Sequence, residues 1–106
     1  LLSQMLERYD DQFSRYIVIK DGDKVISTCS TYGEVNDIAL IGSVIVHPDY
    51  RRRGLAAEVE GYTGKMVRNE GKIGIGFVNY ENTPSINLHE KIGCKRVASL
   101  YKFVRK

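Results

Sequence analysis

The sequence predicts a single α/β domain of the α+β kind, with a mixed, mostly antiparallel sheet and helices on both faces. Three observations predict this fold class. β-Branched runs separated by turn residues fill the first half of the chain. A long helical pattern then follows the most apolar run, as in a strand-helix-strand crossover. The length of 106 residues, 42% of them hydrophobic, is enough for one core but not for two, so we expect one domain over residues 1–106.

The chain is expected to open with a short amphipathic helix over residues 1–13. Leu2, Met5, Leu6 and Tyr9 recur there at helical spacing, ahead of an acidic pair. This helix would precede the first strand of the sheet.

A β-hairpin is predicted next. Residues 15–20 and 24–32 are rich in Ile, Val, Thr and Tyr, which favour strands. Asp21-Gly22 between them is typical of a tight turn. The two segments are therefore expected to pair in antiparallel fashion.

A third strand is predicted over residues 38–46, after a polar break at residues 33–37. Its apolar run is nearly continuous, so we expect this strand to be buried on both faces. Together with the hairpin it forms a three-strand meander, which with the loop that follows covers residues 15–53.

The next element is a helix over residues 54–70, ended by Gly71. Gly61 and Gly64 each cost about 1 kcal/mol relative to alanine inside a helix, so their presence favours close packing of this helix. The face expected to meet the sheet carries Leu55, Val59, Tyr62 and Met66.

The remaining elements are a strand, a short helix and a last strand. Residues 73–78 are the fourth strand, reached by a crossover that should be right-handed. Asn82 or Thr83 then caps a helix that ends at Gly93. Residues 94–104 form the last strand, so residues 54–106 read as helix, strand, helix, strand.

Composition excludes several classes of function. The net charge of +3 is too modest for a long-range nucleic-acid field. The apolar runs are too short to span a bilayer, and the first residues are unlike a signal peptide, so we expect a cytoplasmic protein. Cys29 and Cys94 fall in predicted strands without clustered histidines, which indicates reduced core thiols and no metal site.

The junction at residues 44–57 is the best candidate for a binding site. Gly54 and the alanines open a helix whose first amides lack partners, and the helix dipole favours an anion there. Arg51, Arg52 and Arg53 add positive charge just before it. The spacing of the known nucleotide-binding loops is absent, so we expect a phosphate or pyrophosphate site of another kind.

Two sequence blocks resemble the GNAT superfamily of N-acetyltransferases. The spacing Arg51-x-x-Gly54-x-Ala56, preceded by Val44-x-Val46-x-Pro48, is similar to the acyl-CoA loop of that family. The block Asn82-x-x-Ser85-x-x-Leu88-His89-Glu90-Lys91-Ile92-Gly93-Cys94 is similar to its N-x-x-[AS]-x-x-L-Y-E-K-x-G-F. The resemblance covers about residues 15–106.

The resemblance implies acetyl transfer from acetyl-CoA to a primary amine, without a metal. It also implies that the amides and side chains of the loop hold the CoA diphosphate. The backbone at Val44 and Val46 would pair with the pantetheine arm where the strands spread beside Val78, and strand amides near Val46 would stabilise the oxyanion. The implied donor-binding residues are Val44, Val46, Arg51, Arg52, Arg53, Gly54, Leu55, Ala56, Ala57, Asn82 and Ser85.

His89 is the candidate catalytic residue, because family members commonly carry tyrosine at this position and use it to protonate the departing thiolate. An imidazolium with its usual pKa of about 6.5 could protonate a thiolate. The alternative is an exposed helix histidine without a role. A base stays unassigned: Glu34 and Asp37 could relay a proton through water, but a solvated loop accounts for both.

Other interpretations remain open. The arginines could form a solvated basic turn or touch nucleic acid, Ser85 could be only a small packing residue, and His47 is most simply a surface residue. The acyl group could differ from acetyl, or the chain could be a CoA-binding or regulatory module without turnover. The acceptor is expected to be a small-molecule or peptide amine, and homodimerisation is left open.

The beginning of the chain departs from the family pattern. A full member has a strand and two helices ahead of the hairpin, whereas only residues 1–13 stand there in this sequence. The chain also starts without Met, so the N-terminal part is expected to be short or missing, as in a fragment of a longer protein.

Overall fold

A computed structural model describes residues 6–10 and 14–99 of the chain. One five-stranded sheet has its strands in chain order, β1-β2-β3-β4-β5. The first four strands pair antiparallel, and β5 pairs parallel with β4, so the predicted mixed, mostly antiparallel sheet is confirmed. The elements are β1 (Leu6–Asp10), β2 (Arg15–Asp21), β3 (Lys24–Val35), β4 (Ile38–Val46), the 3-10 turn η2 (Pro48–Tyr50), α1 (Leu55–Asn69), β5 (Ile73–Ile75) and α2 (Thr83–Lys91).

The helix predicted over residues 1–13 is wrong where the structure describes it, because Leu6–Asp10 is strand β1. β1 pairs with β2 from Leu6↔Ile19 to Asp10↔Arg15. Pairing with a neighbouring strand stabilises this segment more than a short helix would, because short isolated helices are only marginally stable. Arg8 and Asp10, two residues apart on one face of the strand, also form an ion pair at 3.1 Å. Residues 1–5 and 11–13 lie outside the described residues.

The hairpin of β2 and β3 is confirmed, with its turn at Gly22 and Asp23. Gly22 has a φ of +62°, which a residue with a side chain rarely adopts. The predicted polar break is shorter than residues 33–37, because Gly33, Glu34 and Val35 still pair with β4. Only Asn36 and Asp37 form the turn.

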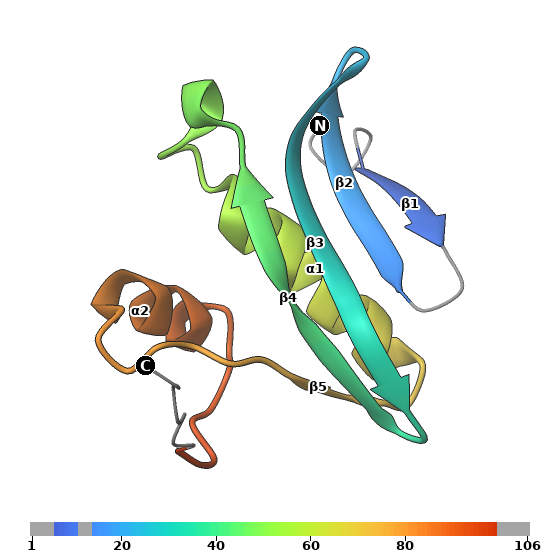
Figure 1. Ribbon diagram of the computed structural model, residues 1–106, viewed down its shortest axis with the longest axis vertical. Helices are drawn as coiled ribbons and strands as arrows, with labels where there is room; N and C mark the ends of the chain where they lie inside the picture. Colours follow the sequence, from blue (N-terminus) through green and yellow to red (C-terminus); the bar gives the residue numbers. More distant parts are fainter. Residues whose placement is uncertain (1–5, 11–13, 100–106) are drawn as a thin grey trace, which may run out of the picture.

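Helix α1 packs on one face of the sheet, mainly over β3 and β4 (Figure 1). Its predicted span is confirmed, with Gly54 as N-cap and Glu70 as C-cap. The predicted buried face was partly wrong, because Tyr62 is 46% exposed while Thr63 and Val67 are buried. Around Gly61 and Gly64 there is open space, so these glycines do not mark close packing.

Strand β4 is buried on one face only, contrary to the expectation. Ala39 and Ile41 are buried, whereas Ile38 and Ile45 are 39% and 64% exposed. The buried side faces α1, and the core of these elements consists of Ile17, Ile19, Ile26, Cys29, Ala39, Ile41, Leu55, Val59 and Val67.

Strand β5 is shorter than predicted, since it ends at Ile75 and not near Val78. Gly74 lets β5 approach β4 closely, because a side chain there would come within 2.7 Å of the Ile41 side chain. After Ile75 the chain leaves the sheet, so the parallel pairing stops at Leu40↔Ile75.

The C-terminal part is only partly as predicted. α2 is confirmed, with Asn82 as N-cap, and stands to the side of β4 (Figure 1). Residues 94–99 are not a strand, and residues 100–104 lie outside the described residues. Cys29 is a buried free thiol as expected, and burial raises its pKa to about 11. Cys94 is exposed and not in a strand, so its prediction as a core thiol was wrong.

Candidate active site

The parting of β4 from the chain after β5 opens a cavity of about 400 Å³. From Ile41 onward the side of β4 that faced β5 has no strand partner among the described residues. α1 forms another wall, and α2 closes the cavity from the side. The lining residues are Ile41, Gly42, Ser43, Val44, Ala56, Glu60, Gly76, Phe77, Pro84, Ser85, Leu88 and His89.

A β-bulge shapes the β4 wall of this cavity. Thr28 pairs with Ile45 and Ser30 pairs with Gly42, so Ser43 and Val44 together oppose the single residue Cys29. Ser43 has a φ of +55°, an uncommon conformation for a residue with a side chain. Such a bulge bends the strand and leaves the extra residue outside the regular ladder. Val44, one of the residues predicted to bind acetyl-CoA, therefore lies at an irregular point of the cavity wall.

The start of α1 meets the cavity at Ala56. The N-cap Gly54 has a φ of +77° and provides no side-chain hydrogen bond to the first turn. The first amides of α1 therefore have no side-chain cap, which leaves them available to an anion. Of the predicted neighbours, Leu55 is buried in the core, and Ala57 is half-buried.

The three arginines lie before this helix, are exposed, and do not line the cavity. Arg51 Nε donates to the Val46 carbonyl at 3.4 Å, and the Arg53 guanidinium lies 5.0 Å from the centre of the Tyr50 ring. The Tyr50 hydroxyl also donates to Asp21 at 2.7 Å, which ties the loop to the β2–β3 turn. Arg51 and Arg53 are therefore held beside the helix start, and all three arginines keep their charge in solvent.

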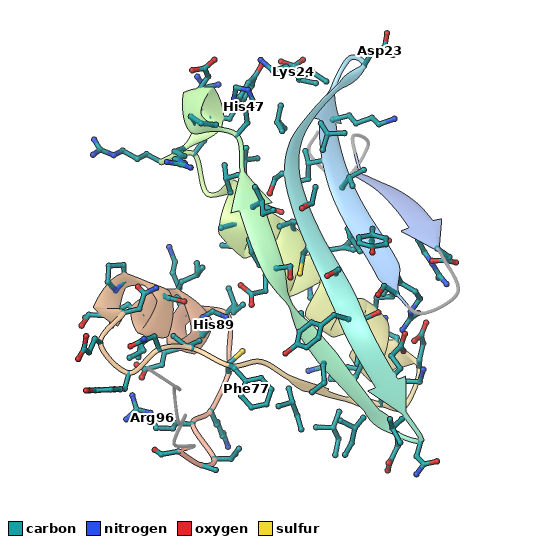
Figure 2. The ribbon with its side chains drawn as sticks, viewed as in Figure 1. Asp23, Lys24, His47, Phe77, His89 and Arg96 are labelled. Carbon is teal, nitrogen blue, oxygen red and sulfur yellow. The ribbon has the colours of Figure 1, made fainter. Side chains whose placement is uncertain are left out.

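His47 lies at the end of β4, next to the η2 turn and far from His89 (Figure 2). Its Nδ1 accepts a hydrogen bond from the Asp49 amide at 3.1 Å. His47 caps this turn and does not line the cavity, and it is half-buried where the sequence suggested a surface residue.

Asn82 and Ser85 are both predicted to contact acetyl-CoA, but they differ in their position relative to the cavity. The Asn82 side chain accepts from the Ser85 amide at 3.2 Å and so caps α2, but it does not line the cavity. Ser85 does line it, and its Oγ lies 3.4 Å from Nδ1 of His89.

His89 is held between the two helices. It lies on the side of α2 nearest to β4 (Figure 2), where its side chain is only 20% exposed. Nδ1 is 2.6 Å from the Ser85 carbonyl oxygen, and Nε2 is 2.6 Å from Oε1 of Glu60 on α1. The interpretation of His89 as an exposed helix residue is therefore wrong in its premise.

The two contacts define where protons must lie. A carbonyl oxygen only accepts hydrogen bonds, so Nδ1 of His89 carries a proton and donates it to Ser85. Nε2 and the Glu60 oxygen would both be acceptors in a neutral histidine and a carboxylate, and two acceptors do not meet at 2.6 Å. One further proton therefore lies between His89 and Glu60.

Glu60 is the site residue that the sequence analysis missed. It is 7% exposed, lines the cavity, and its Oε2 is buried without a hydrogen-bond partner in the described part of the chain. A signal existed, because Glu60 follows the buried Val59 and stands one helical turn after Ala56 of the loop motif. The other lining residues that were missed come mainly from the bulge in β4 and from the chain after β5. The sequence pattern alone does not predict where these segments lie in space.

Glu34 has a structural position that differs from the predicted solvated loop. Its carboxylate lies 2.7 Å from both Arg15 and Lys72 and accepts from the Thr31 hydroxyl. Burial alone would raise the pKa of Glu34, but the hydrogen bonds from Arg15, Lys72 and Thr31 outweigh it and lower that pKa to about 2. Neither Glu34 nor Asp37 lines the cavity, so neither is placed to act as a base there.

Within residues 6–10 and 14–99, no group of three or more histidine, cysteine, aspartate or glutamate side chains could hold a metal ion. The helices of the same residues include none that is long and apolar enough to cross a membrane.

The fold is shared with solved acetyltransferases. Aminoglycoside N-acetyltransferase AAC(6')-Iy in complex with CoA has a TM-score of 0.72 at 16% identity, with 91% of this chain and 78% of that chain covered. AAC(6')-IG from Acinetobacter haemolyticus has a TM-score of 0.66 at 13% identity, covering 99% and 88%. A ribosomal-protein alanine N-acetyltransferase from Escherichia coli has a TM-score of 0.70 at 19% identity, covering 87% and 66%. At identities this low, the structural similarity shows a common fold and no more than that.

A comparison with curated proteins finds no significant match. The family model described as the acetyltransferase (GNAT) family matches residues 2–94, which is most of the sequence. This match and the shared fold agree with the two sequence blocks, and the chain therefore belongs to the GNAT family of N-acetyltransferases.

Proposed function

We propose that this chain transfers an acetyl group from acetyl-CoA to a primary amine of a small molecule or a peptide. The observation that supports this most is the cavity, which joins an uncapped helix start at Ala56 to the paired side chains of Glu60 and His89. A donor with phosphates at one end and a reactive thioester at the other would use both parts.

The donor would bind along the free side of β4. Its diphosphate would take the uncapped amides at the start of α1, with Arg51, Arg52 and Arg53 adding positive charge beside them. The pantetheine arm would follow the backbone from Val46 to Ser43, where β5 no longer covers β4. The similar structures of AAC(6')-Iy hold CoA or a bisubstrate analogue containing it, which supports this assignment of the donor.

The reaction would take place near the β4 bulge. The thioester carbonyl becomes an oxyanion when the amine attacks, and backbone amides released by the bulge at Ser43 and Val44 would stabilise its charge. The leaving sulfur then needs a proton. His89 is the proposed source, although both of its ring nitrogens are already hydrogen bonded.

The acceptor belongs to the class of primary amines. Similar folds are named for acetylation of aminoglycosides and of an alanine of a ribosomal protein, so small-molecule and peptide amines are both supported by analogy of fold. A cytoplasmic location, where acetyl-CoA would be available, fits this proposal.

Two measurements on the purified chain test the proposal. Calorimetry should show acetyl-CoA binding, and incubation with a panel of aminoglycosides and N-terminal peptides should release CoA thiol and yield an acetylated amine. Binding without transfer to any amine would support the alternative, a CoA-binding or regulatory module. Absence of binding would reject both.

A further inference from the structure

The Glu60–His89 pair, defined by these two side chains, has features that simple packing does not require. Each member comes from a different helix, and each lines the cavity. Their contact at 2.6 Å is short, as is typical of charge-assisted hydrogen bonds, and the pair is largely shielded from solvent. A buried acid-histidine contact at the edge of a cavity is costly to desolvate, which favours a chemical role for the pair.

In the part of the chain that the structure describes, the residues around the pair supply no cation that would balance the charge of the Glu60 carboxylate, so the contact between Glu60 and His89 relies on the proton that they share. Among the described residues, no lysine or arginine forms an ion pair with Glu60, and its side-chain partner is His89. Burial is the main cause that raises the pKa of the Cys29 and Cys94 thiols, and the negative charge of Glu60 also raises the pKa of each. Loss of the shared proton would leave a buried carboxylate facing the lone pair of Nε2.

We propose that Glu60 and His89 act as one proton-transfer unit, in which Glu60 is the positioning residue that holds a proton on Nε2 of His89. This inference rests on the proposed acetyl transfer and assigns the proton that the transfer needs. It assigns the proton for the sulfur to Nε2 and its partner Glu60, because Nδ1 is hydrogen bonded to the Ser85 carbonyl.

The proton balance of the reaction closes within this unit. A neutral amine attacks the thioester, the C–N bond forms, and the C–S bond breaks with its electron pair on sulfur. The proton shared by Nε2 and Oε1 moves to the thiolate and gives CoA thiol. The proton released by the attacking nitrogen returns to the pair at Glu60, whose Oε2 has no hydrogen-bond partner among the described residues. One proton leaves and one arrives, so the starting charge is restored.

Glu60→Gln tests this chemistry while keeping the shape of the site. The Gln amide can donate to the Nε2 lone pair of the Nδ1-protonated histidine, so the helix contact remains but the shared proton is lost. We expect kcat to fall roughly 10²-fold or more, while the dissociation constant of acetyl-CoA stays unchanged. The matched control is Glu90→Gln, which removes an exposed carboxylate from the residue next to His89 and should leave kcat unchanged.

A double mutant shows whether the two residues work as a unit. His89→Phe should also lower kcat, and Glu60→Gln with His89→Phe should lose no more than the larger single effect. The inference would be overturned if the kcat losses of the two single variants multiplied in the double variant, or if Glu60→Gln had a normal kcat. Either result would leave the acetyltransferase proposal intact. A wild-type chain that binds no acetyl-CoA would instead reject the proposed function.

Nitrogen NMR of His89 supplies a measurement that needs no turnover and no variant. In the wild-type chain, both ring nitrogens should report protonated or strongly hydrogen-bonded states at neutral pH. A neutral ring with an unprotonated, unbonded Nε2 would overturn the shared proton directly, even if Glu60→Gln proved unstable.

Discussion

The two helices on either side of the cavity are built in opposite ways. α1 has fifteen residues and buries five of them, whereas α2 has nine residues and buries none. Their first turns differ as well, because Asn82 caps α2 with its side chain while Gly54 leaves α1 without a side-chain cap. α1 is thus a well-packed helix with an uncapped start for an anion, and α2 is a lightly packed wall that is hydrogen bonded to α1 through the Glu60–His89 pair.

The largest expected difference concerns stability. Leu55→Ala removes a buried side chain from α1 and should lower the free energy of unfolding by about 2–5 kcal/mol. Leu88→Ala is the matched change in α2, where the side chain is only half-buried, and should cost about 1 kcal/mol or less. Urea unfolding of both variants measures this difference. Equal losses would show that α2 is as firmly packed as α1.

A second difference lies at the far end of α1, where Arg15 joins Glu34 of β3 to Glu70 after the helix. The pKa of Glu34 is lowered to about 2 in the fold, so its contribution is complete above the usual pKa of about 4.3 and is lost as the pH falls toward 2. We expect the wild-type chain to lose about 2 kcal/mol of unfolding free energy over this range beyond what Glu34→Gln loses. Denaturant unfolding between pH 5 and 2 tests it, and parallel curves would contradict it.

The open end of α1 should be sensitive to charge. Gly54→Glu places a carboxylate beside the proposed phosphate site and a side chain at a φ of +77°, so acetyl-CoA should bind at least about tenfold more weakly, or about 1.4 kcal/mol. Gly54→Asn is the control, because asparagine tolerates this backbone conformation without adding charge. Calorimetry should show much weaker binding only for the glutamate variant. Equal affinity in wild type and Gly54→Glu would remove the phosphates from this loop.

The smallest expected effect is ionic. If Arg51, Arg52 and Arg53 attract the phosphates from solvent, CoA should bind better than dephosphorylated pantetheine, and the preference should shrink as salt rises. A random oligonucleotide should bind weakly in comparison. Tight, salt-sensitive oligonucleotide binding without CoA binding would favour the nucleic-acid interpretation of the same arginines.

The elements that carry their own pattern were predictable from the sequence. The β2–β3 hairpin has a turn glycine, α1 lies between Gly54 and Gly71, and α2 has its cap at Asn82, so local rules fix their limits. β1 was mistaken for a helix because its apolar residues fit helical spacing, while its pairing with β2 is a long-range contact that no local pattern contains.

The cavity itself was only partly predictable. Val44, Ala56, Ser85 and His89 were identified from the two motifs, and the structure gathers all four around one cavity. The position of Glu60 one helical turn after Ala56 was visible in the sequence, but its contact was not, because its partner His89 is 29 residues away and on another helix. The early end of β5 was also hidden, since residues 76–78 continue an apolar run and only their position in space takes them out of the sheet.

The order of the strands in the sheet bears on how the cavity is assembled during folding. Every antiparallel neighbour is also the next strand in the chain, so the meander from β1 to β4 closes short loops at low entropic cost. β5 follows α1 in the chain, so its pairing with β4 closes a loop that contains the whole helix, and α2 comes after β5. We therefore expect the cavity walls to come together last. Acetyl-CoA that spans β4, α1 and α2 would bind only chains that have completed this step. It would therefore stabilise the native state over partly folded states that lack the cavity.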